Sequence, residues 1–426
     1  MVQAVRGTFD ILPTEARLWQ AIEGELRAVF GAYGFGEIRT PVFEATELFV
    51  RSVGEETDIV SKEMYTFSDR DGSTSLTLRP EGTAPVVRSY IEHRLSDESR
   101  MIKLYYIGPM FRRERPQKGR FRQFHQAGVE VLSGNDNPAI EAETIEMLAL
   151  VLARLGVTGY ELLINSIGCG ECRPAFLGRL RAEIGQQSAA LCADCRRRGE
   201  KNPLRVFDCK VPSCQPVIAA LPTVTSSLCR ACEVHFARFR QYLDERGLPY
   251  RVDERLVRGL DYYMRTTFEV VSGSLGAQDT LAAGGRYDGL AEDLEGPPTK
   301  GFGFAMGLER LMLSIPDPGV LAPERGPDYF LATHGDEAFR LATGLARKLR
   351  AAGQAVYIDF DGRSLKSQMR LAGKLKASRV VILGEDEVRS GKLTVRDMQT
   401  REQGEWTEDE LLAGIPADLQ GSRGSG

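Results

Sequence analysis

The stretch from Leu104 to Leu132 constrains the fold of this chain more than any other part of its sequence. Its residues, LYYIGPMFRRERPQKGRFRQFHQAGVEVL, predict a strand, a charged loop and a second strand. Side chains alternate between the two faces of a strand. In the second strand one face carries Phe124, Gln126, Gly128 and Glu130, and the other carries His125, Ala127, Val129 and Val131. A glutamine and a carboxylate on either side of a glycine, all on one face, indicate a floor for a small polar ligand.

The loop between the two strands is strongly cationic. Its six basic residues are Arg112, Arg113, Arg115, Lys118, Arg120 and Arg122. Guanidinium groups bind phosphate through paired hydrogen bonds, so the loop predicts a phosphate site beside the polar strand face. The alternative is an exposed hairpin with a solvated charged tip, which is the usual explanation of a charge run.

Composition limits the function classes that remain. A chain of 426 residues is expected to form two or three domains. Because the net charge is −4, no global basic field attracts nucleic acid, and any RNA binding has to rest on local patches. We find no apolar run long enough to span a bilayer and no signal-peptide core at the N-terminus, so we expect a cytoplasmic protein.

The cysteines predict a metal-binding insertion. All eight lie between positions 169 and 232, in four close pairs: Cys169 with Cys172, Cys192 with Cys195, Cys209 with Cys214, and Cys229 with Cys232. In a cytoplasmic chain this spacing favours structural Zn²⁺ held by thiolates over disulfides. Two tetrahedral sites and one site with spare thiols both remain open, as do reduced structural cysteines and redox pairs. A segment this short buries little core, so a metal would stabilise it.

Further elements follow from periodicity. Apolar residues recur at helical spacing after Thr14, a candidate N-cap, up to Gly34. Phe35–Phe43 is expected to be a strand, and its Pro41 suits an edge or a subunit contact. The other expected elements are a hairpin of Met64–Phe67 with Ser75–Leu78, a helix at Ala139–Leu155, strands at Glu161–Ile167 and Thr266–Val271, and a glycine-rich strand at 301–307 that runs into a helix.

A proline-rich linker, Ser314–Gly326, separates a C-terminal α/β unit with a largely parallel sheet. Its strands are expected at Tyr329–Thr333, Ala355–Asp359 and Val380–Gly384, and its helices at Glu337–Ala352 and Ser364–Ala377. One face of the second helix has a basic stripe, made of Arg363, Lys366, Arg370 and Lys374. The stripe is either an RNA-facing surface or a solvated helix face.

Several motifs carry a family resemblance. FRRERPQKGRFRQFHQAGVE resembles the second signature motif of class II aminoacyl-tRNA synthetases, in the form found in histidyl-tRNA synthetases. LVRGLDYY at 256–263 and AGGRYDG at 283–289 are similar to two motifs private to the histidyl family. FGEIRTPVF at 35–43 and GFGFAMGLER at 301–310 resemble the first and third class II motifs.

The resemblance implies an α+β fold: a class II core, with an antiparallel sheet flanked by helices, plus a small Cys-rich insertion and a C-terminal α/β anticodon-binding domain. The implied domains are the core at 1–168 and 251–320, the insertion at 169–250 and the anticodon-binding domain at 327–420. In the family the insertion touches the tRNA acceptor arm, whereas cysteine ligation is not among the shared motifs. The implied activity is ligation of L-histidine to its cognate tRNA through a histidyl-adenylate, with ATP and Mg²⁺, by a cytoplasmic homodimer.

The resemblance also implies roles for individual residues. Catalytic and ATP-binding roles fall on Arg258, Arg112, Arg310 and Glu114. Histidine-binding roles fall on Glu81, Gly82, Thr83, Gln126, Glu130, Tyr262, Tyr263 and Tyr287. Contacts with the tRNA acceptor end fall on Gln117, Lys118 and Arg120.

Two other functions share features of this sequence. The regulatory subunit of ATP phosphoribosyltransferase has the same core fold, but it ordinarily lacks the C-terminal domain and motif arginines. A histidine or uncharged-tRNA sensor would bind without turnover. This chain keeps the C-terminal domain, Arg112, Arg258 and Arg310, which disfavours both alternatives.

Overall fold

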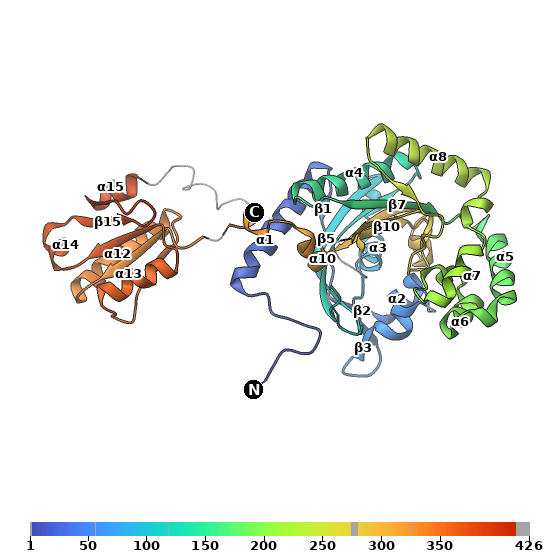
Figure 1. The fold of residues 1–426 in the computed structure, drawn as a ribbon, viewed down its shortest axis with the longest axis horizontal. Helices are drawn as coiled ribbons and strands as arrows, with labels where there is room; N and C mark the ends of the chain where they lie inside the picture. The colour runs from blue at the N-terminus through green and yellow to red at the C-terminus, as the bar shows by residue number, and fades with distance from the viewer. Residues whose placement is uncertain (1, 56, 118, 274–279, 324, 415–426) are drawn as a thin grey trace. The chain divides into compact units, whose positions relative to one another are not determined.

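The computed structural model describes residues 2–55, 57–117, 119–273, 280–323 and 325–414 (Figure 1). The chain divides into two compact units, Met1–Ala322 and Pro323–Gly426. The boundary falls within the expected linker Ser314–Gly326. Each unit has its own apolar core, so each is described by itself.

The first unit is built on an eight-stranded sheet with the order β1-β5-β6-β11-β10-β9-β7-β8. The central strands pair antiparallel, whereas β1 and β8 pair parallel to β5 and β7 at the two edges. The strands are β1 (Gly36–Glu37), β5 (Met101–Phe111), β6 (Gln123–Ser133), β7 (Tyr160–Ser166), β8 (Arg251–Val252), β9 (Met264–Ser272), β10 (Thr280–Arg286) and β11 (Lys300–Gly307). The expected antiparallel sheet is thereby confirmed.

Helices cover both faces of this sheet (Figure 1). On one face α1 (Pro13–Ala32), α4 (Pro138–Arg154) and α8 (Arg230–Glu245) enclose the main core. Ala127, Val129 and Val131 of β6 point into that core, which confirms the predicted alternation. The opposite face of β6 carries the polar side chains, and α3 (Thr83–Glu92) packs there through Val86 against Tyr106.

The predicted strand Phe35–Phe43 is wrong as one element. Only β1 and β2 (Phe43–Ala45) form, and they belong to different sheets. Pro41 has no N–H for a ladder, and the Arg79 guanidinium satisfies the carbonyls of Thr40 and Pro41 instead, at 2.9 and 3.3 Å. The predicted hairpin is confirmed as β3 (Tyr65–Ser68) and β4 (Ser75–Leu78), and β4 pairs with β2.

Other helices differ from the expectation mainly at their ends. Helix α1 starts at Pro13, so Thr14 lies inside the first turn and does not cap the helix. A proline suits the first helical position because its missing N–H would have no partner there. The remaining helices of the core are α2 (Thr46–Val53), α9 (Leu290–Asp293), α10 (Leu308–Ser314) and α11 (Pro318–Leu321), with a π-helical turn at Ile59–Glu63.

The cysteine-rich insertion is helical. It contains α5 (Arg173–Gln186), α6 (Ala193–Lys201) and α7 (Gln215–Ala220), with short 3₁₀ turns between them, among them Pro203–Asp208. Its apolar side chains, such as Phe176 and Leu180, form one cluster with Tyr263 and Tyr287 of the core. The insertion therefore packs directly against the elements that carry the histidyl-family motifs.

The second unit confirms the expected α/β pattern and extends it. Its sheet has the order β13-β12-β14-β15-β16, in which β12 pairs parallel with β13 and β14. The strands are β12 (Tyr329–Thr333), β13 (Val356–Ile358), β14 (Arg379–Leu383), β15 (Leu393–Asp397) and β16 (Gln403–Trp406). The helices are α12 (Asp336–Ala351), α13 (Leu365–Lys374), α14 (Glu385–Ser390) and α15 (Glu408–Ala413). The antiparallel pairings of β15 and β16 were not predicted.

No single helix among the described residues combines the length and apolarity needed to cross a membrane. The segments Pro212–Ser227 and Arg230–Glu245 meet that test only as a pair, and they are bent by 97° at the break between them.

Candidate active site

A pocket opens on the polar face of the large sheet, and it gathers most of the residues singled out from the sequence. Lining residues from that set are Glu81, Thr83, Arg112, Glu114, Arg120, Gln126, Arg258, Tyr262, Tyr263 and Arg310. They come from four separated segments of the chain: the start of α3, the β5–β6 hairpin, the turn before β9, and α10. Glu130 and Tyr287 lie behind the lining, while Lys118 falls outside the described residues.

Glu130 is the most enclosed carboxylate of the site, at 1% exposure. Its two oxygens accept hydrogen bonds from the Thr83 hydroxyl at 2.7 Å and the Tyr287 hydroxyl at 2.5 Å. Burial nevertheless raises the pKa of this carboxyl to about 8, because desolvation outweighs both donors. At neutral pH the Glu130 carboxyl is therefore mostly protonated, so it can donate one hydrogen bond as well as accept others.

Glycines make the room that these side chains occupy. A Cβ on Gly303 would lie 2.1 Å from Glu130 Oε2, so this glycine leaves the space that the Glu130 carboxylate occupies. The Tyr106 ring lies between two further glycines, Gly82 and Gly128. A Cβ on Gly82 would lie 2.2 Å from this ring, and a Cβ on Gly128 would lie 2.3 Å from it. Tyr106 was missed by sequence reasoning. Its register partner on β6 is Gly128, and a large residue opposite a glycine is the signal that could have found it.

Glu81 has a structural partner set of its own. Its carboxylate accepts the backbone N–H groups of Thr83 and Ala84, at 2.7 and 2.9 Å, and so satisfies the first turn of α3. Burial raises the pKa of Glu81 against these hydrogen bonds. Glu81 also lines the pocket, so the oxygen lone pairs that the backbone leaves unused remain available to a ligand there.

The arginines that line the pocket are held by neighbouring groups. Arg112 donates from Nε to the Pro80 carbonyl at 2.9 Å and lies 5.3 Å from the Phe124 ring centroid. Arg310 donates from Nε to the Gly119 carbonyl at 3.0 Å and from Nη1 to the Thr280 carbonyl at 3.1 Å. Arg258 pairs with Glu269, a partner that sequence reasoning missed, and its guanidinium lies 5.8 Å from the Tyr263 ring. Such anchoring sets where their remaining N–H groups can point.

The loop residues form the rim of this pocket. Glu114 pairs with Arg120 at 3.2 Å and lies 3.9 Å from Arg112. Gln117 and Arg120 exchange backbone hydrogen bonds of 3.2 and 2.9 Å across a tight turn. Arg113, Arg115 and Gln117 are exposed, whereas Arg112 and Arg120 line the pocket. The cationic loop is therefore in part a solvated tip and in part a wall of the pocket.

Buried polar atoms of the pocket lack partners. Among the described residues Gln126 Oε1 and Arg258 Nε have no hydrogen-bond partner, although both are shielded from solvent. A buried polar group without a partner costs about 1–3 kcal/mol. Since both residues line the pocket, a polar ligand would remove that cost.

The eight cysteines form two groups of four. Cys169, Cys172, Cys229 and Cys232 make the first, which we call the base cluster, and Cys192, Cys195, Cys209 and Cys214 make the second, the distal cluster. Within each group all Sγ atoms lie within 4.8 Å of one another, and the closest pairs are 3.8 to 4.0 Å apart. Tetrahedral zinc with Zn–S bonds of about 2.3 Å requires sulfurs about 3.8 Å apart, whereas a disulfide requires about 2.05 Å. The thiol positions fit metal and do not fit disulfides.

In the second unit the predicted basic stripe is exposed on α13. Lys366, Arg370 and Lys374 face solvent, while Arg363 lies just before the helix and pairs with Asp359 and Asp361 at 2.9 and 2.5 Å. The predicted apolar face of the helix is confirmed, because Leu365, Met369, Ala372 and Leu375 pack against the sheet.

Two family models match the chain. The model described as "Histidyl-tRNA synthetase" covers residues 7–172 and 212–311, and the one described as "Anticodon binding domain" covers 329–418. The chain belongs to the histidyl-tRNA synthetase family. The family resemblance, the fold class and the anticodon-binding type of the second unit are thus confirmed.

Curated relatives of this histidyl-tRNA synthetase family member match it over nearly its whole length. Histidine--tRNA ligase of Solibacter usitatus is 51% identical over 418 residues, which is 98% of this chain and 99% of the relative. The same enzyme of Syntrophotalea carbinolica is 50% identical over 425 residues, which is 100% of both chains. Apo histidyl-tRNA synthetase of S. aureus superposes with a TM-score of 0.82 at 38% identity, covering 97% of this chain and 99% of that one.

A more distant structure bears on the alternatives. A protein of Bacillus halodurans described as an ATP phosphoribosyltransferase regulatory subunit/histidyl-tRNA synthetase has a TM-score of 0.65 at 21% identity, and it covers 90% of this chain and 98% of its own. That likeness shows a shared fold and nothing more. The full-length identity to ligases separates this histidyl-tRNA synthetase family member from the regulatory alternative.

The family match has one gap. Residues 173–211 fall outside it, and that span contains three of the four distal cysteines. The cysteine chemistry of the insertion therefore has to be argued from this chain itself.

Proposed function

We propose that this protein ligates L-histidine to its cognate tRNA in two steps, with a histidyl-adenylate as the intermediate. The observation that carries the proposal is one pocket that combines Gln126 with Arg112, Arg258 and Arg310, with the buried Glu130 behind its lining. Family membership and about 50% identity to ligases over the full length support it.

In the first step the histidine carboxylate attacks the α-phosphate of ATP and pyrophosphate leaves. The nucleophile is already anionic, so the protein contributes alignment and neutralises charge that builds up on phosphate oxygens. We assign Arg258 and Arg112 to the α-phosphate, Arg310 to the γ-phosphate region and Glu114 to the neighbourhood of adenine. Mg²⁺ arriving with ATP supplies further positive charge on the phosphates.

Histidine selection needs hydrogen bonds to both imidazole nitrogens, because a site built for them rejects analogues without them. We assign Glu130 and Tyr263 to this role, with Tyr262 and Tyr287 enclosing the ring. Gln126 would meet the substrate carboxylate through its polar side-chain atoms. Glu81, with Gly82 and Thr83, would meet the α-ammonium, and its burial next to the pocket supports that assignment.

In the second step the terminal ribose 3′-hydroxyl of tRNA attacks the adenylate carbonyl and AMP leaves. The leaving phosphate can accept the proton, so we assign no side-chain base. Gln117, Lys118 and Arg120 are proposed to meet the acceptor end. The unit at 327–420 is proposed to bind the anticodon, and it agrees with the family match at 329–418.

We further propose a cytoplasmic homodimer with the core at 1–168 and 251–320 and the insertion at 169–250. The three-stranded sheet β2-β4-β3 exposes Phe43 and Phe67, and Val42 just before β2 is exposed beside them. The accessible fractions of these three residues are 40–48%. Phe43 and Phe67 contact each other edge to face, with ring centroids 6.4 Å apart. Burial of this apolar surface by a second copy would support a dimer.

We propose that each cysteine cluster binds one Zn²⁺. The sulfur spacing supports this, and the pairing left open by the sequence becomes base cluster and distal cluster. Zinc would stabilise an insertion that has a small core of its own. No part in the reaction is assigned to it.

Histidine-dependent exchange of pyrophosphate into ATP tests the proposed function. We expect exchange with histidine and with none of the other amino acids. Replacing Arg258 by alanine is expected to lower the exchange rate by about 10²- to 10³-fold, because Arg258 stabilises charge that develops in the transition state. Absence of exchange by folded, zinc-loaded protein would contradict the proposal.

A further inference from the structure

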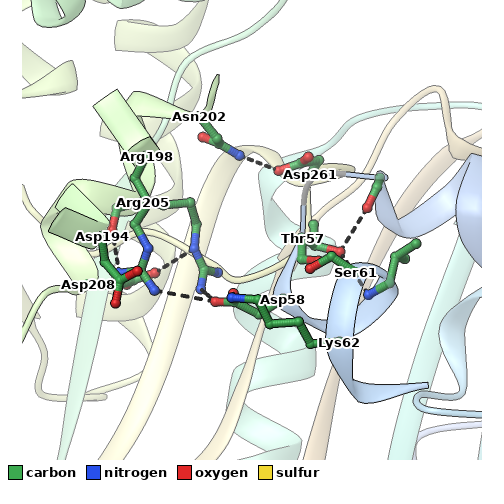
Figure 2. Close-up of polar contacts among 12 residues, drawn as sticks. Thr57, Asp58, Ser61, Lys62, Asp194, Arg198, Asn202, Arg205, Asp208 and Asp261 are labelled. Carbon is green, nitrogen blue, oxygen red and sulfur yellow. Dashed lines mark hydrogen bonds and ion pairs between the residues drawn. The ribbon is translucent and has the colours of Figure 1, made fainter. Parts of the chain in front are cut away.

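A short segment of the insertion touches the loop that carries Arg258. The segment runs from Cys195 to Cys209, both of which belong to the distal cluster, and it comprises the end of α6 and the 3₁₀ turn Pro203–Asp208. We call it the bracketed segment, because cluster ligands stand at both its ends. Figure 2 shows its polar side chains reaching two parts of the core, one around Asp58 and one at Asp261.

The first contact is a charge cluster at Asp58. Arg198 and Arg205 both donate to Asp58 Oδ2, at 3.3 and 3.4 Å, and Lys62 donates to Oδ1 at 3.4 Å (Figure 2). Burial opposes ionisation of Asp58, but these three cations outweigh it and hold the pKa of the carboxyl below its ordinary value. Arg205 also pairs with Asp208 at 3.1 Å, so its guanidinium is fixed from two sides.

The second contact reaches the loop of the histidyl-family motif directly. The Asn202 side-chain amide donates to Asp261 Oδ1 at 2.7 Å (Figure 2). The Arg205 guanidinium lies close to Gly259, since a Cβ there would come 2.7 Å from Arg205 Nη1. Asp261 is anchored on its other side, where its backbone N–H donates to the Val53 carbonyl at 3.2 Å. The loop 258–261 is thus held between the insertion and the end of α2.

Apolar packing joins the same two segments. Leu204 and Val206 of the bracketed segment share one buried cluster with Val257 and Tyr263 on either side of the loop, and Leu260 packs against that cluster. The loop itself forms no strand, so it has no ladder hydrogen bonds to define its path. Its conformation depends on these side-chain contacts, and the position of Arg258 depends on its conformation.

We propose that the bracketed segment positions the loop 258–261 for adenylate formation, with Asn202 and Arg205 as its positioning residues. The inference rests on the proposed function, because it assigns the insertion a part in the first step in addition to any contact with tRNA. Neither residue lines the pocket. Both lie within residues 173–211, outside the family match.

The test uses the full-length protein without tRNA, so that acceptor-arm contacts play no part. Asn202→Asp places a second carboxylate against Asp261 at a half-buried position. The concentration of active sites is measured from the amount of adenylate formed, and kcat of pyrophosphate exchange is expressed per active site. We expect this kcat to fall about tenfold, with KM for ATP and histidine nearly unchanged. Adding Asp261→Asn restores an amide–carboxylate pair in reverse and is expected to recover most of kcat.

Two more variants complete the design. Arg205→Ala removes the contacts with Asp58, Asp208 and Gly259, and it is expected to lower kcat at least as much as Asn202→Asp. Arg197→Ala is the control, because Arg197 lies on α6 within the bracketed segment, and the ion pair it makes among the described residues is with exposed Asp194, at 2.8 Å. Zinc content and melting temperature are measured for every variant.

The outcomes separate the two proposals. Inactive wild-type protein would overturn the proposed function and this inference with it. Active wild-type protein together with an unchanged kcat per titrated site in Asn202→Asp and Arg205→Ala would overturn the inference alone. Equal losses of activity and titratable sites, without a fall in kcat per site, would assign these residues a purely structural role and would also overturn it.

Discussion

Glu130 combines a buried position with a carboxyl group whose pKa is raised to about 8. In the unfolded chain the same group titrates near 4.5. Between these two values the folded state holds a proton that the unfolded state has lost, so the free energy of unfolding falls as pH rises. Glu81 is buried nearby and its pKa is raised in the same direction, so it adds to that slope.

We therefore expect Glu130→Gln to remove part of the pH dependence of stability. The difference in melting temperature, variant minus wild type, should increase as pH rises from about 5 to about 8 and then stay constant. Over this range the variant should gain about 1–3 kcal/mol in free energy of unfolding relative to the wild type. Thermal unfolding of ligand-free protein at several pH values checks this, with Glu183→Gln on α5 as the control. Parallel curves for wild type and Glu130→Gln would contradict it.

The sequence predicted correctly which side chains share a face of one strand, but it did not predict which side chains from other segments contact them. The alternation along β6 placed Gln126 and Glu130 on one face, because a strand has a fixed period of two. The partners of Glu130 could not be read in this way. Thr83, Tyr287 and Gly303 come from three distant segments, and only the register of β11 on β6 brings Gly303 opposite Glu130.

The two cysteine clusters are separate elements of the insertion. The base cluster joins the chain after β7 to the start of α8, and the distal cluster joins α6 to the turn before α7. Because four cysteines form each group, loss of one thiolate leaves three ligands and weakens one site only.

We expect about two zinc ions per chain in the wild type and about one in either Cys172→Ser or Cys209→Ser. Metal analysis of purified protein measures this, with Ser188→Ala as a control in the same insertion. Retention of both ions in the single variants, or loss of both in either one, would contradict independent sites.

Element boundaries were predicted well for long periodic segments. Helices α4 and α12 and the hairpin β3–β4 agree with the expectation to within one or two residues. Cysteine pairing could not be predicted, because close pairs in sequence allow several groupings and the fold of α5 to α8 selects one. Strands β15 and β16 were missed because they follow an α/β pattern that already accounted for a complete sheet.

The two units make separate contributions to the whole reaction. Adenylate formation is proposed to use the pocket of the first unit, and tRNA binding is proposed to use α13 of the second. Lys366, Arg370 and Lys374 are exposed along that helix, so they can reach phosphates without displacing packed side chains.

The double variant Arg370→Glu and Lys374→Glu should bind tRNA at least tenfold more weakly. The slope of its log affinity against log salt concentration should fall by the equivalent of about one to two phosphate contacts. Histidine-dependent pyrophosphate exchange without tRNA should not change. The matched control reverses Arg340 and Arg347 on α12, which are also exposed. Equal salt slopes for the two double variants would assign α13 to a solvated face.

The base cluster has a consequence for how this insertion can vary. Cys169 and Cys172 stand where the chain leaves the core, and Cys229 and Cys232 stand where it returns, with Sγ atoms of the two ends 3.8 to 4.0 Å apart. Residues 173–228 therefore leave the core and rejoin it at one place, so the length of this segment can change without moving β7 or α8. An insertion transplanted from a relative would therefore leave the core folded. It would slow adenylate formation, however, unless it also carried its own counterparts of Asn202 and Arg205.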